Sequence, residues 1–397
     1  MNKKISVGMA VSLMALAAAV AVAATMVFST SIFNSKIANL NERQAIYDKI
    51  IEINKIVREN YNGEIDEKTL LDSLSTGFAY GISDIYAEYY PADEYSDLKA
   101  DLNGNAVGIG VDIVKDVEGY IKILSVYPDS PAEISGLLKG DQIVKVGEID
   151  ALTKYSEAVN AIKGDAGTSV TVTVRRAGED SVIEITRRKV TVPSVESQML
   201  DDNIAYIKIK DFNTNTVEQF ESALASSVSS GAAGLVIDVR NNGGGTMKSV
   251  AKIIDMIVPE GPIVSSTNKD NETKVMYKSD SAEVNLPISV LVNKNTASAS
   301  ELFAAALRDY NKAKLVGANT YGKGVMQDIY QLSDGSAIKI TTGKFNPPTS
   351  ENFNGVGLKP DFVVELTAEQ EKLWYDLDFS TDPQIVKAIS VVKALNN

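Results

Sequence analysis

The chain has neither cysteine nor histidine among its 397 residues. Without cysteine it can form no disulfide and no thiolate metal cage, so its fold must rest on buried apolar surface. Hydrophobic residues make up 44% of the sequence, which is enough for a sizeable core in about two or three domains. The two absences also exclude Ser-His-Asp and Cys-His catalysis, so a hydrolase of this composition must move protons with Lys, Asp, Glu or Tyr.

The net charge is strongly negative, −13 from 39 basic and 52 acidic side chains. A nucleic-acid-binding protein needs a basic surface that displaces counterions from phosphates, so this class is excluded. Peptides or small molecules are the expected partners. Anionic lipid headgroups would repel so acidic a surface, and attachment to a membrane therefore requires an inserted apolar segment.

An uncharged stretch, residues 5–35, follows Lys3 and Lys4, and residues 5–28 are its densest apolar part. This length suffices to span a bilayer. We expect an uncleaved anchor, with the paired lysines holding the N-terminus in the cytoplasm and the rest of the chain outside. A cleavable signal peptide is the alternative, because residues 19–21 (Ala-Val-Ala) could serve as its cleavage site.

Apolar residues recur at helical spacing between about residues 41 and 102. Ile46, Ile50, Ile53 and Ile56 illustrate the pattern. We expect an amphipathic helical region here. It could pack on a partner helix or a second subunit, or equally on its own domain.

The apolar pattern changes to a period of two between about residues 104 and 193, which indicates β-strands. Ser130 as N-cap, Pro131 at the first helical position and Glu133 predict a single helical turn that ends at Gly136. A second helix is expected at residues 154–162, ending before Gly164. The strands are expected at residues 107–114, 120–126, 142–146, 170–175 and 182–186.

Residues 130–146 (Ser-Pro-Ala-Glu-Ile-Ser-Gly-Leu-Leu-Lys-Gly-Asp-Gln-Ile-Val-Lys-Val) resemble the signature of a PDZ domain of the bacterial protease type. Gly108-Ile109-Gly110 matches the loop with which such domains bind a peptide's C-terminal carboxylate. A Gly-x-Gly pair alone is more often a bulge or turn, but residues 130–146 favour the loop. The resemblance implies a peptide that lies as an added strand on the sheet edge. Lys163 stands where some relatives have an arginine proposed to sense the peptide, although a solvated lysine is the simpler interpretation.

After Pro193 apolar strands alternate with helices, which predicts a sheet covered on both faces. A strand at residues 204–209 precedes a helix at 216–226. The next strand, residues 234–239, runs into the polar and glycine-rich residues 240–245. The glycines there form a turn where backbone N–H groups can point into a cavity.

A further apolar strand, residues 288–292, leads through a polar turn into a helix at residues 302–310. Ser298 lies in that turn, where the helix N-terminus offers unpaired N–H donors and a positive dipole that suit an oxyanion beside a serine hydroxyl. The alternative is a structural capping box from Ser298 to Glu301. Lys323, between two glycines, is similarly either a surface charge or a side chain directed inward.

Four motifs occur in order along the chain, Leu-Val-Ile-Asp-Val-Arg-Asn-Asn-Gly-Gly-Gly at residues 235–245, Ala-Ser-Ala-Ser-Glu at 297–301, Tyr-Gly-Lys-Gly-Val-Met-Gln at 321–327 and Gly-Val-Gly-Leu-Lys-Pro-Asp at 355–361. With them, the chain from about residue 61 to 366 resembles the carboxyl-terminal processing peptidases. This is the tail-specific protease family of Ser/Lys endopeptidases that carry a PDZ module.

The resemblance implies that Ser298 is the nucleophile, Lys323 the general base and Gln327 an orienting residue, and the family spacing selects Ser298 over Ser300. A lysine base working near neutrality must have its pKa lowered from about 10.4. Burial can do this by disfavouring the ammonium, and the residues around Lys323 in the sequence are Gly, Val, Met and Tyr. We therefore expect a buried lysine without an adjacent carboxylate.

The resemblance also implies an oxyanion hole formed by the backbone N–H groups of Ala299 and Gly244. The family usually has proline where this chain has Gly243, so it stays open which glycine of residues 243–245 completes the hole. No metal and no cofactor are implied.

The expected organisation is a multidomain α/β protein with an anchor or signal segment (1–34), an N-terminal helical region (35–103), a PDZ domain (104–193), a crotonase-like α/β serine protease core (194–366) and a C-terminal helical region (367–397). The expected function is cleavage of proteins whose accessible C-terminal tail is captured by the PDZ domain, which gates activity. A catalytically inactive PDZ scaffold is the alternative. The resemblance further implies a homodimer. From the apolar run we expect a location at a bacterial cell membrane, single-pass through residues 5–28 with the catalytic part outside, or a secreted form after signal cleavage.

Overall fold

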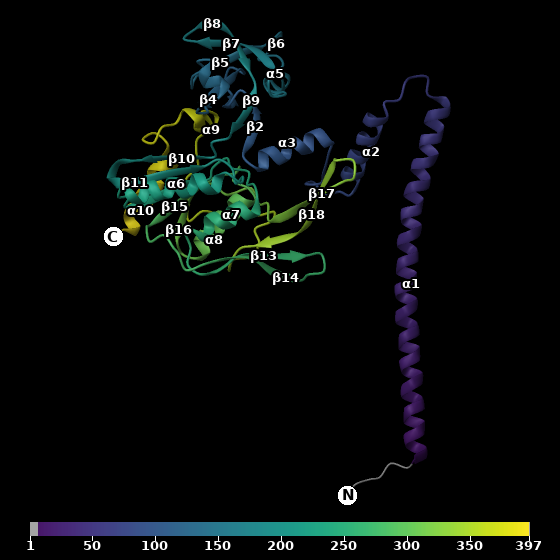
Figure 1. The fold of residues 1–397 in the computed structure, drawn as a ribbon. Coiled ribbons are helices and arrows are strands. Elements are labelled where there is room, and N and C mark those ends of the chain that lie inside the picture. Colours follow the sequence, from purple (N-terminus) through teal and green to yellow (C-terminus); the bar gives the residue numbers. More distant parts are fainter. Residues whose placement is uncertain (1–6, 397) are drawn as a thin grey trace. The chain divides into compact units, whose positions relative to one another are not determined.

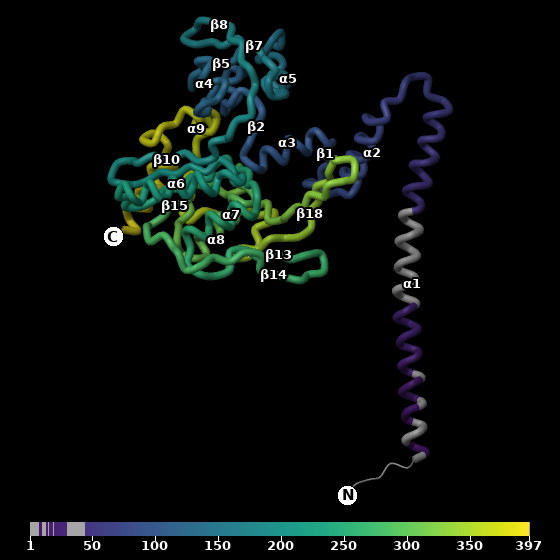
Figure 2. The backbone as a smooth tube through the Cα atoms, viewed as in Figure 1, coloured from purple at the N-terminus to yellow at the C-terminus, as the bar shows by residue number. Residues whose placement is uncertain are grey.

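Figures 1 and 2 show the computed structural model, which describes the backbone of residues 7–396 and, within the first helix, only some of the side chains. The chain forms two compact units that divide between Leu70 and Leu71. The first unit is helical, and the second contains every strand of the described residues.

A single long helix, α1 (Val7–Asn60), makes up most of the first unit. A short turn then leads to α2 (Glu67–Gly81), which Asp66 caps by accepting the N–H groups of Lys68 and Thr69 at 2.9 and 3.0 Å. A side-chain oxygen in this position satisfies donors that the first turn of a helix leaves unpaired. The cap therefore explains why the second helix begins where it does.

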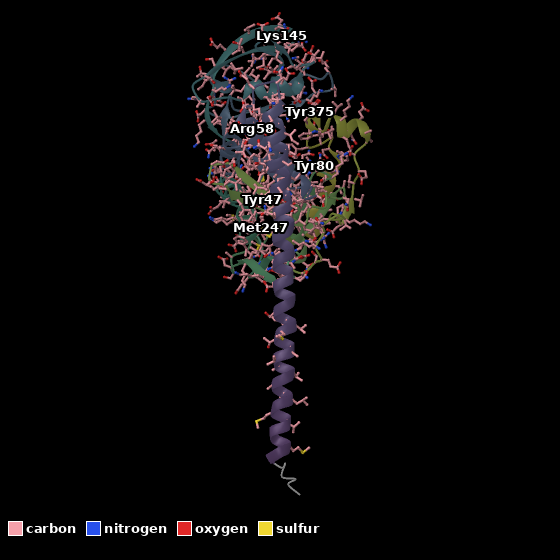
Figure 3. All side chains as sticks on the ribbon, turned by 90° about the vertical axis from the view of Figure 1, so that its right-hand side faces the viewer. Tyr47, Arg58, Tyr80, Lys145, Met247 and Tyr375 are labelled. Carbon is pink, nitrogen blue, oxygen red and sulfur yellow. The ribbon has the colours of Figure 1, made fainter. Side chains whose placement is uncertain are left out.

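Large apolar side chains of α1 are exposed, among them Ile46, Tyr47, Ile51, Ile53 and Ile56. Figure 3 shows side chains that project from this helix, with Tyr47 labelled. The anchor expected at residues 5–28 lies partly outside the described residues. Among the helices that the structure describes, none has an apolar stretch long enough to cross a membrane.

The chain between α2 and the β module differs from the helix expected there. After Gly81 a loop leads into a short strand, β1 (Glu88–Tyr90), before α3 (Ala92–Leu102). β1 pairs antiparallel with β18 (Ala337–Asn346). The region is otherwise mostly helical, as expected, and these three residues form a strand because β18 supplies the hydrogen-bond partners.

A mostly β module with two short helices follows, as expected. Its main sheet has the strand order β3-β4-β5-β7-β8, with β6 on β5, and β2 pairs separately with β9. The Ser130 hydroxyl accepts the Glu133 N–H, which confirms the helix start at Pro131. The elements are β2 (Asn105–Gly108), β3 (Val111–Lys115), β4 (Ile121–Val126), α4 (Pro131–Ile134), β5 (Gln142–Val146), β6 (Ile149–Asp150), α5 (Tyr155–Ile162), β7 (Ser169–Arg176), β8 (Glu179–Thr186) and β9 (Arg188–Thr191).

One expected strand of this module, residues 107–114, is interrupted. Gly110 has a φ of +83°, and a Cβ on it would lie 2.3 Å from the Cβ of Ser130. Glycine alone accommodates both the backbone conformation and the close approach. The chain therefore bends between β2 and β3, and β3 becomes an edge strand of the main sheet.

The largest part of the second unit is a six-stranded sheet in the order β10-β11-β12-β15-β16-β19, parallel except for the β10–β11 pair. Parallel strands need crossover connections, and helices supply most of them here. The elements are β10 (Val195–Met199), a 3₁₀ turn (Asp201–Asn203), β11 (Ile204–Ile209), α6 (Thr216–Ser229), β12 (Gly234–Asp238), α7 (Met247–Asp255), β15 (Ile288–Val292), α8 (Ala299–Asp309), β16 (Ala313–Gly317) and β19 (Phe362–Val363).

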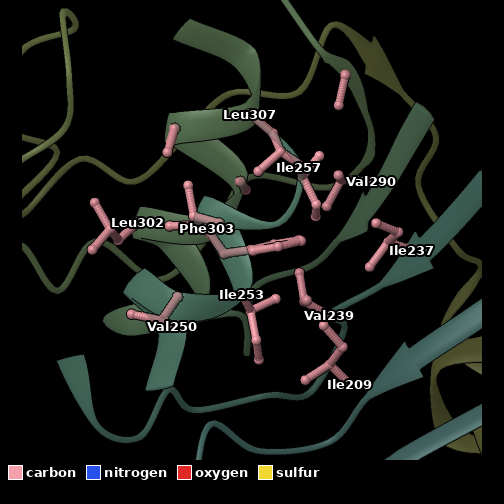
Figure 4. Packing of buried hydrophobic residues seen from close by; sticks show 14 of the residues in the cluster. Ile209, Ile237, Val239, Val250, Ile253, Ile257, Val290, Leu302, Phe303 and Leu307 are labelled. Atoms are coloured by element: carbon pink, nitrogen blue, oxygen red, sulfur yellow. The ribbon is translucent and has the colours of Figure 1, made fainter. Parts of the chain in front are cut away.

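Side chains alternate between the two faces of this sheet. On one face Ile237 and Val290 pack with α7 and α8, for example against Ile253 and Phe303, as Figure 4 shows. On the other face Val236, whose side chain points the opposite way, packs against α10 (Pro383–Leu395). Both faces are therefore covered, as the continuous apolar strands predicted.

A second sheet extends the core and carries part of the candidate site. Its path is β1-β18-β13-β14, and β17 pairs with β18. The remaining elements are β13 (Gly261–Asn268), β14 (Thr273–Ser279), β17 (Val325–Gln331), α9 (Ala368–Lys372) and a 3₁₀ turn (Trp374–Asp376). The C-terminal region is thus less helical than expected before α10, which begins at its N-cap Asp382.

Candidate active site

Ser298 lies in the turn between β15 and α8, as expected. It has φ of +57° and ψ of −119°, an uncommon conformation for a residue with a side chain, and it is partly exposed. Ser300 is completely buried, and its Oγ has no hydrogen-bond partner. A substrate can therefore reach the hydroxyl of Ser298 and not that of Ser300.

Glu301 ties the serine turn to the lysine loop. Its side chain is completely buried. One oxygen, Oε2, accepts the backbone N–H groups of Ser298 and Lys323 at 2.9 and 2.8 Å. The other, Oε1, accepts the Thr320 hydroxyl at 2.5 Å and the Gly322 N–H at 2.7 Å. A single carboxylate thus holds both segments, a role that its place in the predicted capping box did not reveal.

The Lys323 side chain is partly buried, and its amine lies 4.5 Å from the centroid of the Tyr86 ring. Burial lowers the pKa of Lys323, and the positive charge of Lys339 lowers it further, whereas Asp84 acts in the opposite direction. The direction of the pKa shift agrees with the expectation. The absence of an adjacent carboxylate stays a prediction, because the described residues show no ion pair at the Lys323 amine, although the charge of Asp84, in the turn after α2, acts on it.

The reactive atoms of Ser298 and Lys323 are not hydrogen-bonded to each other in the described part of the chain. Gln327, on β17, does not contact either side chain through a hydrogen bond. Its Nε2 donates to the Thr341 Oγ1 at 3.2 Å and to the Val325 carbonyl at 3.5 Å. Glu301 thus joins the backbones of Ser298 and Lys323, while Gln327 bonds to other residues.

The glycine turn after β12 packs directly against the serine turn. A Cβ on Gly244 would lie 3.0 Å from the Cβ of Ser298, and Gly244 has a φ of +116°. Its N–H donates to Oδ1 of the buried Asn242 at 2.8 Å. No hydrogen bond within the described residues engages the N–H groups of Ala299, Gly243 or Gly245. Asn242 is a residue that the sequence did not single out.

The Gly108-Ile109-Gly110 loop, which is expected to bind a peptide C-terminus, differs in its hydrogen bonds from the glycine turn after β12. Neither Ile109 nor Gly110 donates its N–H to another group of the described chain. The Ile109 carbonyl accepts the Ala132 N–H at 2.8 Å and the Gly110 carbonyl accepts the Tyr127 N–H at 3.0 Å. The carbonyls thus fix the loop, and the N–H groups remain available beside the open edge of β3.

Ion pairs connect the β module to the rest of the second unit, and besides Lys122–Asp376 one of them lies next to the glycine loop. Asp112, on β3, accepts a hydrogen bond of 2.6 Å from the Lys210 amine. Burial opposes the ionised form of Asp112, but Lys210 and the hydroxyls of Ser125 and Tyr127 hold its pKa below the usual value. The strand next to the glycine loop is therefore linked electrostatically to the larger sheet.

Lys163 is an exposed residue just after α5. The end of that helix is instead satisfied by Arg187, whose guanidinium donates to the carbonyls of Ile162 and Ala161 at 2.9 and 2.6 Å. Helix C-terminal carbonyls commonly bind such cations. Arg187 is buried and was not identified from the sequence.

The class of protein that combines an α/β core, with a serine at a helix N-terminus beside a glycine turn, and a β module of this kind is that of PDZ-containing serine peptidases. Comparison with known proteins agrees. The sequence profile of Peptidase family S41 matches residues 203–364, and that of the PDZ domain matches residues 122–176.

Curated relatives extend the match over most of the chain. A probable CtpA-like serine protease of Staphylococcus aureus (strain MSSA476) is 33% identical over 337 residues, 84% of this chain and 68% of the relative. The protein of the same name from Staphylococcus epidermidis is 32% identical over 343 residues, 85% of this chain and 70% of the relative. The chain belongs to peptidase family S41, among its CtpA-like carboxyl-terminal processing serine proteases.

Solved structures support the same assignment. The photosystem II D1 C-terminal processing protease is 25% identical, with a TM-score of 0.50 and coverage of 87% of this chain and 91% of that one. A putative S41 protease from Bacteroides fragilis shares the fold at 17% identity and a TM-score of 0.54, covering 85% and 94%. The expected family and the PDZ-plus-protease architecture are thereby confirmed.

Proposed function

We propose that this protein is an endopeptidase in which Ser298 attacks the peptide carbonyl and Lys323 serves as its general base. The observation that supports the proposal is the buried Glu301 carboxylate, which holds the backbone N–H groups of both residues on one oxygen. A fixed distance between the two backbones leaves only side-chain torsions to bring the reactive atoms together. The lowered pKa of Lys323 makes the neutral amine accessible at a pH below that of a free lysine.

The proposed reaction has two halves. The neutral Lys323 amine accepts the Ser298 proton while Oγ attacks the carbonyl carbon, and the same proton passes to the leaving amine as the acyl enzyme forms. Water then hydrolyses the ester, with Lys323 again accepting and returning a proton. Gln327 has no titratable group, so its role is to orient the amine or the hydroxyl.

The developing oxyanion requires preorganised N–H donors. The Ala299 N–H, at the start of α8, is available for this purpose. For Gly244 to contribute the second donor, its N–H must leave the Asn242 side chain that it binds in this structure. Gly243 and Gly245 are the alternatives in the same turn.

We further propose that the PDZ domain captures the substrate's C-terminal tail and gates cleavage. A tail carboxylate would accept the N–H groups of Ile109 and Gly110, and the peptide would add to the edge of β3. Asp112 on β3 binds Lys210 in the core. A peptide strand added to β3 can therefore change the position of this ion pair and so affect the core. The tail activates only to the extent that it binds the active arrangement more tightly than the resting one.

The decisive experiment compares cleavage of a reporter with an apolar C-terminal tail by the wild type, Ser298→Ala and Lys323→Ala. We expect cleavage by the wild type only, while tail-peptide binding persists in all three. Activity should rise with pH through one basic limb, because the neutral form of Lys323 is the base. A wild type that binds tails without Ser298-dependent cleavage would be an inactive scaffold.

The site of action is also a proposal. The apolar residues 5–28 behind Lys3 and Lys4 would anchor the chain in a bacterial membrane with the protease outside. Mass spectrometry of the native protein's N-terminus distinguishes the two alternatives. An intact N-terminus in the membrane fraction supports the anchor, and a soluble form that begins near residue 22 identifies a cleaved signal peptide.

A homodimer is proposed from the uncovered apolar surface of α1. Ile46, Ile53 and Ile56 recur at helical spacing and are all exposed. Ile53→Glu should therefore shift the mass measured by light scattering from that of two chains to that of one. A wild type that is monomeric at the same concentration contradicts the proposal.

A further inference from the structure

The turn between α2 and β1 approaches the lysine loop, although neither the motifs nor the proposed mechanism uses it. Its backbone is stabilised locally, because the Asp84 Oδ1 accepts the Tyr86 N–H at 3.0 Å and the Asp84 carbonyl accepts the Ala87 N–H at 3.0 Å. Hydrogen bonds of this kind define the direction of the residues that follow an aspartate in a turn. They fix the backbone from which the Tyr86 side chain extends.

The same carboxylate attaches the turn to the second sheet. Thr341, on β18, donates its N–H to Asp84 Oδ2 at 2.8 Å and its hydroxyl to Asp84 Oδ1 at 3.1 Å. The Thr341 hydroxyl also accepts the Gln327 Nε2 at 3.2 Å. A hydroxyl can donate once and accept at the same time, so both bonds can coexist. Asp84 is thereby connected through one residue to the Gln327 amide.

Tyr86 connects the turn to Lys323. The ring centroid lies 4.5 Å from the amine, within the range of a cation–π interaction. At its other end, the lysine is fixed by the backbone bond to Glu301. The base is therefore held between two elements, with α8 fixing its main chain and the Asp84–Tyr86 turn contacting its charged end.

Charges on several elements face the amine. Asp84 favours the ammonium form of Lys323, and Lys339, on β18, disfavours it. The donors from Thr341 and Tyr86 keep the pKa of Asp84 below its usual value even though burial opposes this, so the carboxylate is ionised at neutral pH. Burial raises the pKa of the Tyr86 hydroxyl, and Tyr321 and Glu301 raise it further.

We propose that the Asp84–Tyr86 turn is a positioning element of the active site, which places the Lys323 amine against the Tyr86 ring and, through Thr341, aligns the Gln327 amide. The inference rests on the proposed function for its catalytic meaning. Neither Asp84 nor Tyr86 exchanges a proton or forms a bond in the proposed reaction, although the Tyr86 ring contacts the Lys323 amine. They set the position and charge state from which Lys323 accepts the Ser298 proton.

Two substitutions should move the titration of Lys323 in opposite directions. Asp84→Asn retains an acceptor for the Tyr86 N–H but removes the negative charge, so Lys323 should lose its proton at lower pH. Lys339→Gln removes a positive charge, so Lys323 should lose its proton at higher pH. Asp93→Asn, an exposed acidic residue in the first turn of α3, is the matched control and should leave the titration unchanged.

The titration is followed by NMR of ¹³C-methylated lysines, with the Lys323 signal assigned by its loss in Lys323→Ala. This readout is independent of cleavage. Midpoints that stay at the wild-type value in both charge variants overturn the inference, whether or not the protein proves to be a protease. If Asp84→Asn fails to fold, as judged by circular dichroism, Lys339→Gln still decides the charge effect.

The contribution of the Tyr86 ring is measured by kinetics. Tyr86→Leu should lower kcat about tenfold with little change in KM, because the amine loses its aromatic neighbour while the substrate site persists. Tyr86→Phe retains the ring and should keep most of the activity. Tyr80→Leu, on the exposed surface of α2, is the matched control. Equal activity in Tyr86→Leu and wild type contradicts the positioning role, whereas absence of Ser298-dependent cleavage in the wild type contradicts the proposed function instead.

Discussion

Two glycine loops in this molecule have similar geometry and different hydrogen bonding. Gly110 in the PDZ domain and Gly244 in the core both have positive φ and both pack against the Cβ of a serine, Ser130 or Ser298. The N–H groups of Ile109 and Gly110 are unengaged within the described chain, whereas the Gly244 N–H is bonded to Asn242. The N–H groups of Ile109 and Gly110 can therefore bind a new partner without breaking a hydrogen bond, whereas the Gly244 N–H would first have to leave Asn242.

The largest expected effect is a loss of catalysis that leaves peptide binding at the PDZ loop unchanged. Ser298→Ala and Lys323→Ala should each lower kcat/KM by at least about a thousandfold, because a nucleophile or its base is lost. Binding of a tail peptide, measured by calorimetry, should be unchanged. Ser300→Ala serves as the matched control and should cleave like the wild type. Loss of peptide binding in Ser298→Ala would show that the two sites are not independent.

The second effect acts on the PDZ loop. Gly110→Ala introduces a Cβ that would lie 2.3 Å from Ser130 in a backbone conformation unfavourable for alanine, so it should displace the loop N–H groups. We expect tail-peptide affinity to fall at least about tenfold. Gly140→Ala also has a positive φ but meets no atom within 4 Å, so it controls for backbone strain alone. Unchanged cleavage of the tailed reporter by Gly110→Ala would argue against gating by this loop.

A smaller effect, on stability, is expected at Asn242, whose side chain binds the Gly244 N–H in the core loop. Asn242→Ala leaves the buried Gly244 N–H and the Ile209 carbonyl without their partners. The free energy of unfolding in urea should fall by about 1–3 kcal/mol. Affinity of the PDZ domain for a tail peptide should not change. Equal stability of variant and wild type would mean that water replaces the amide without cost.

The smallest effect is expected at Ser300. Its hydroxyl is fully buried and has no hydrogen-bond partner, so Ser300→Ala removes an unsatisfied polar group. The free energy of unfolding should stay the same or rise by up to about 1 kcal/mol. A clear loss of stability would reveal a hydrogen bond that forms in solution.

Local patterns predicted the elements that local interactions stabilise. The Ser130-Pro131 helix start and the apolar strand at residues 288–292 are both present as expected. Predictions failed where a distant segment decides the outcome. Residues 88–90 are a strand because β18 pairs with them, and residues 107–114 divide because Ser130 leaves no space for a side chain at Gly110.

The same distinction between local and distant interactions applies to the residues of the candidate site. The motifs identified Ser298, Lys323 and Gln327 because each lies in a short and distinctive run of residues. They could not identify the contacts of Glu301 with the lysine loop, or the effect of the Asp84 charge on Lys323, because these interactions join separate segments. Nothing in a single sequence states which carboxylate will face which amine.

The sequence by itself determined the available chemistry. A chain without histidine or cysteine has to use an amine, a carboxyl or a phenol to move a proton, and its motifs placed it in the family of carboxyl-terminal processing peptidases. The tertiary structure decided which charges surround that amine and whether the glycine N–H groups are free. The reason is physical, since pKa values and hydrogen bonds depend on distances between groups that only the folded chain brings together.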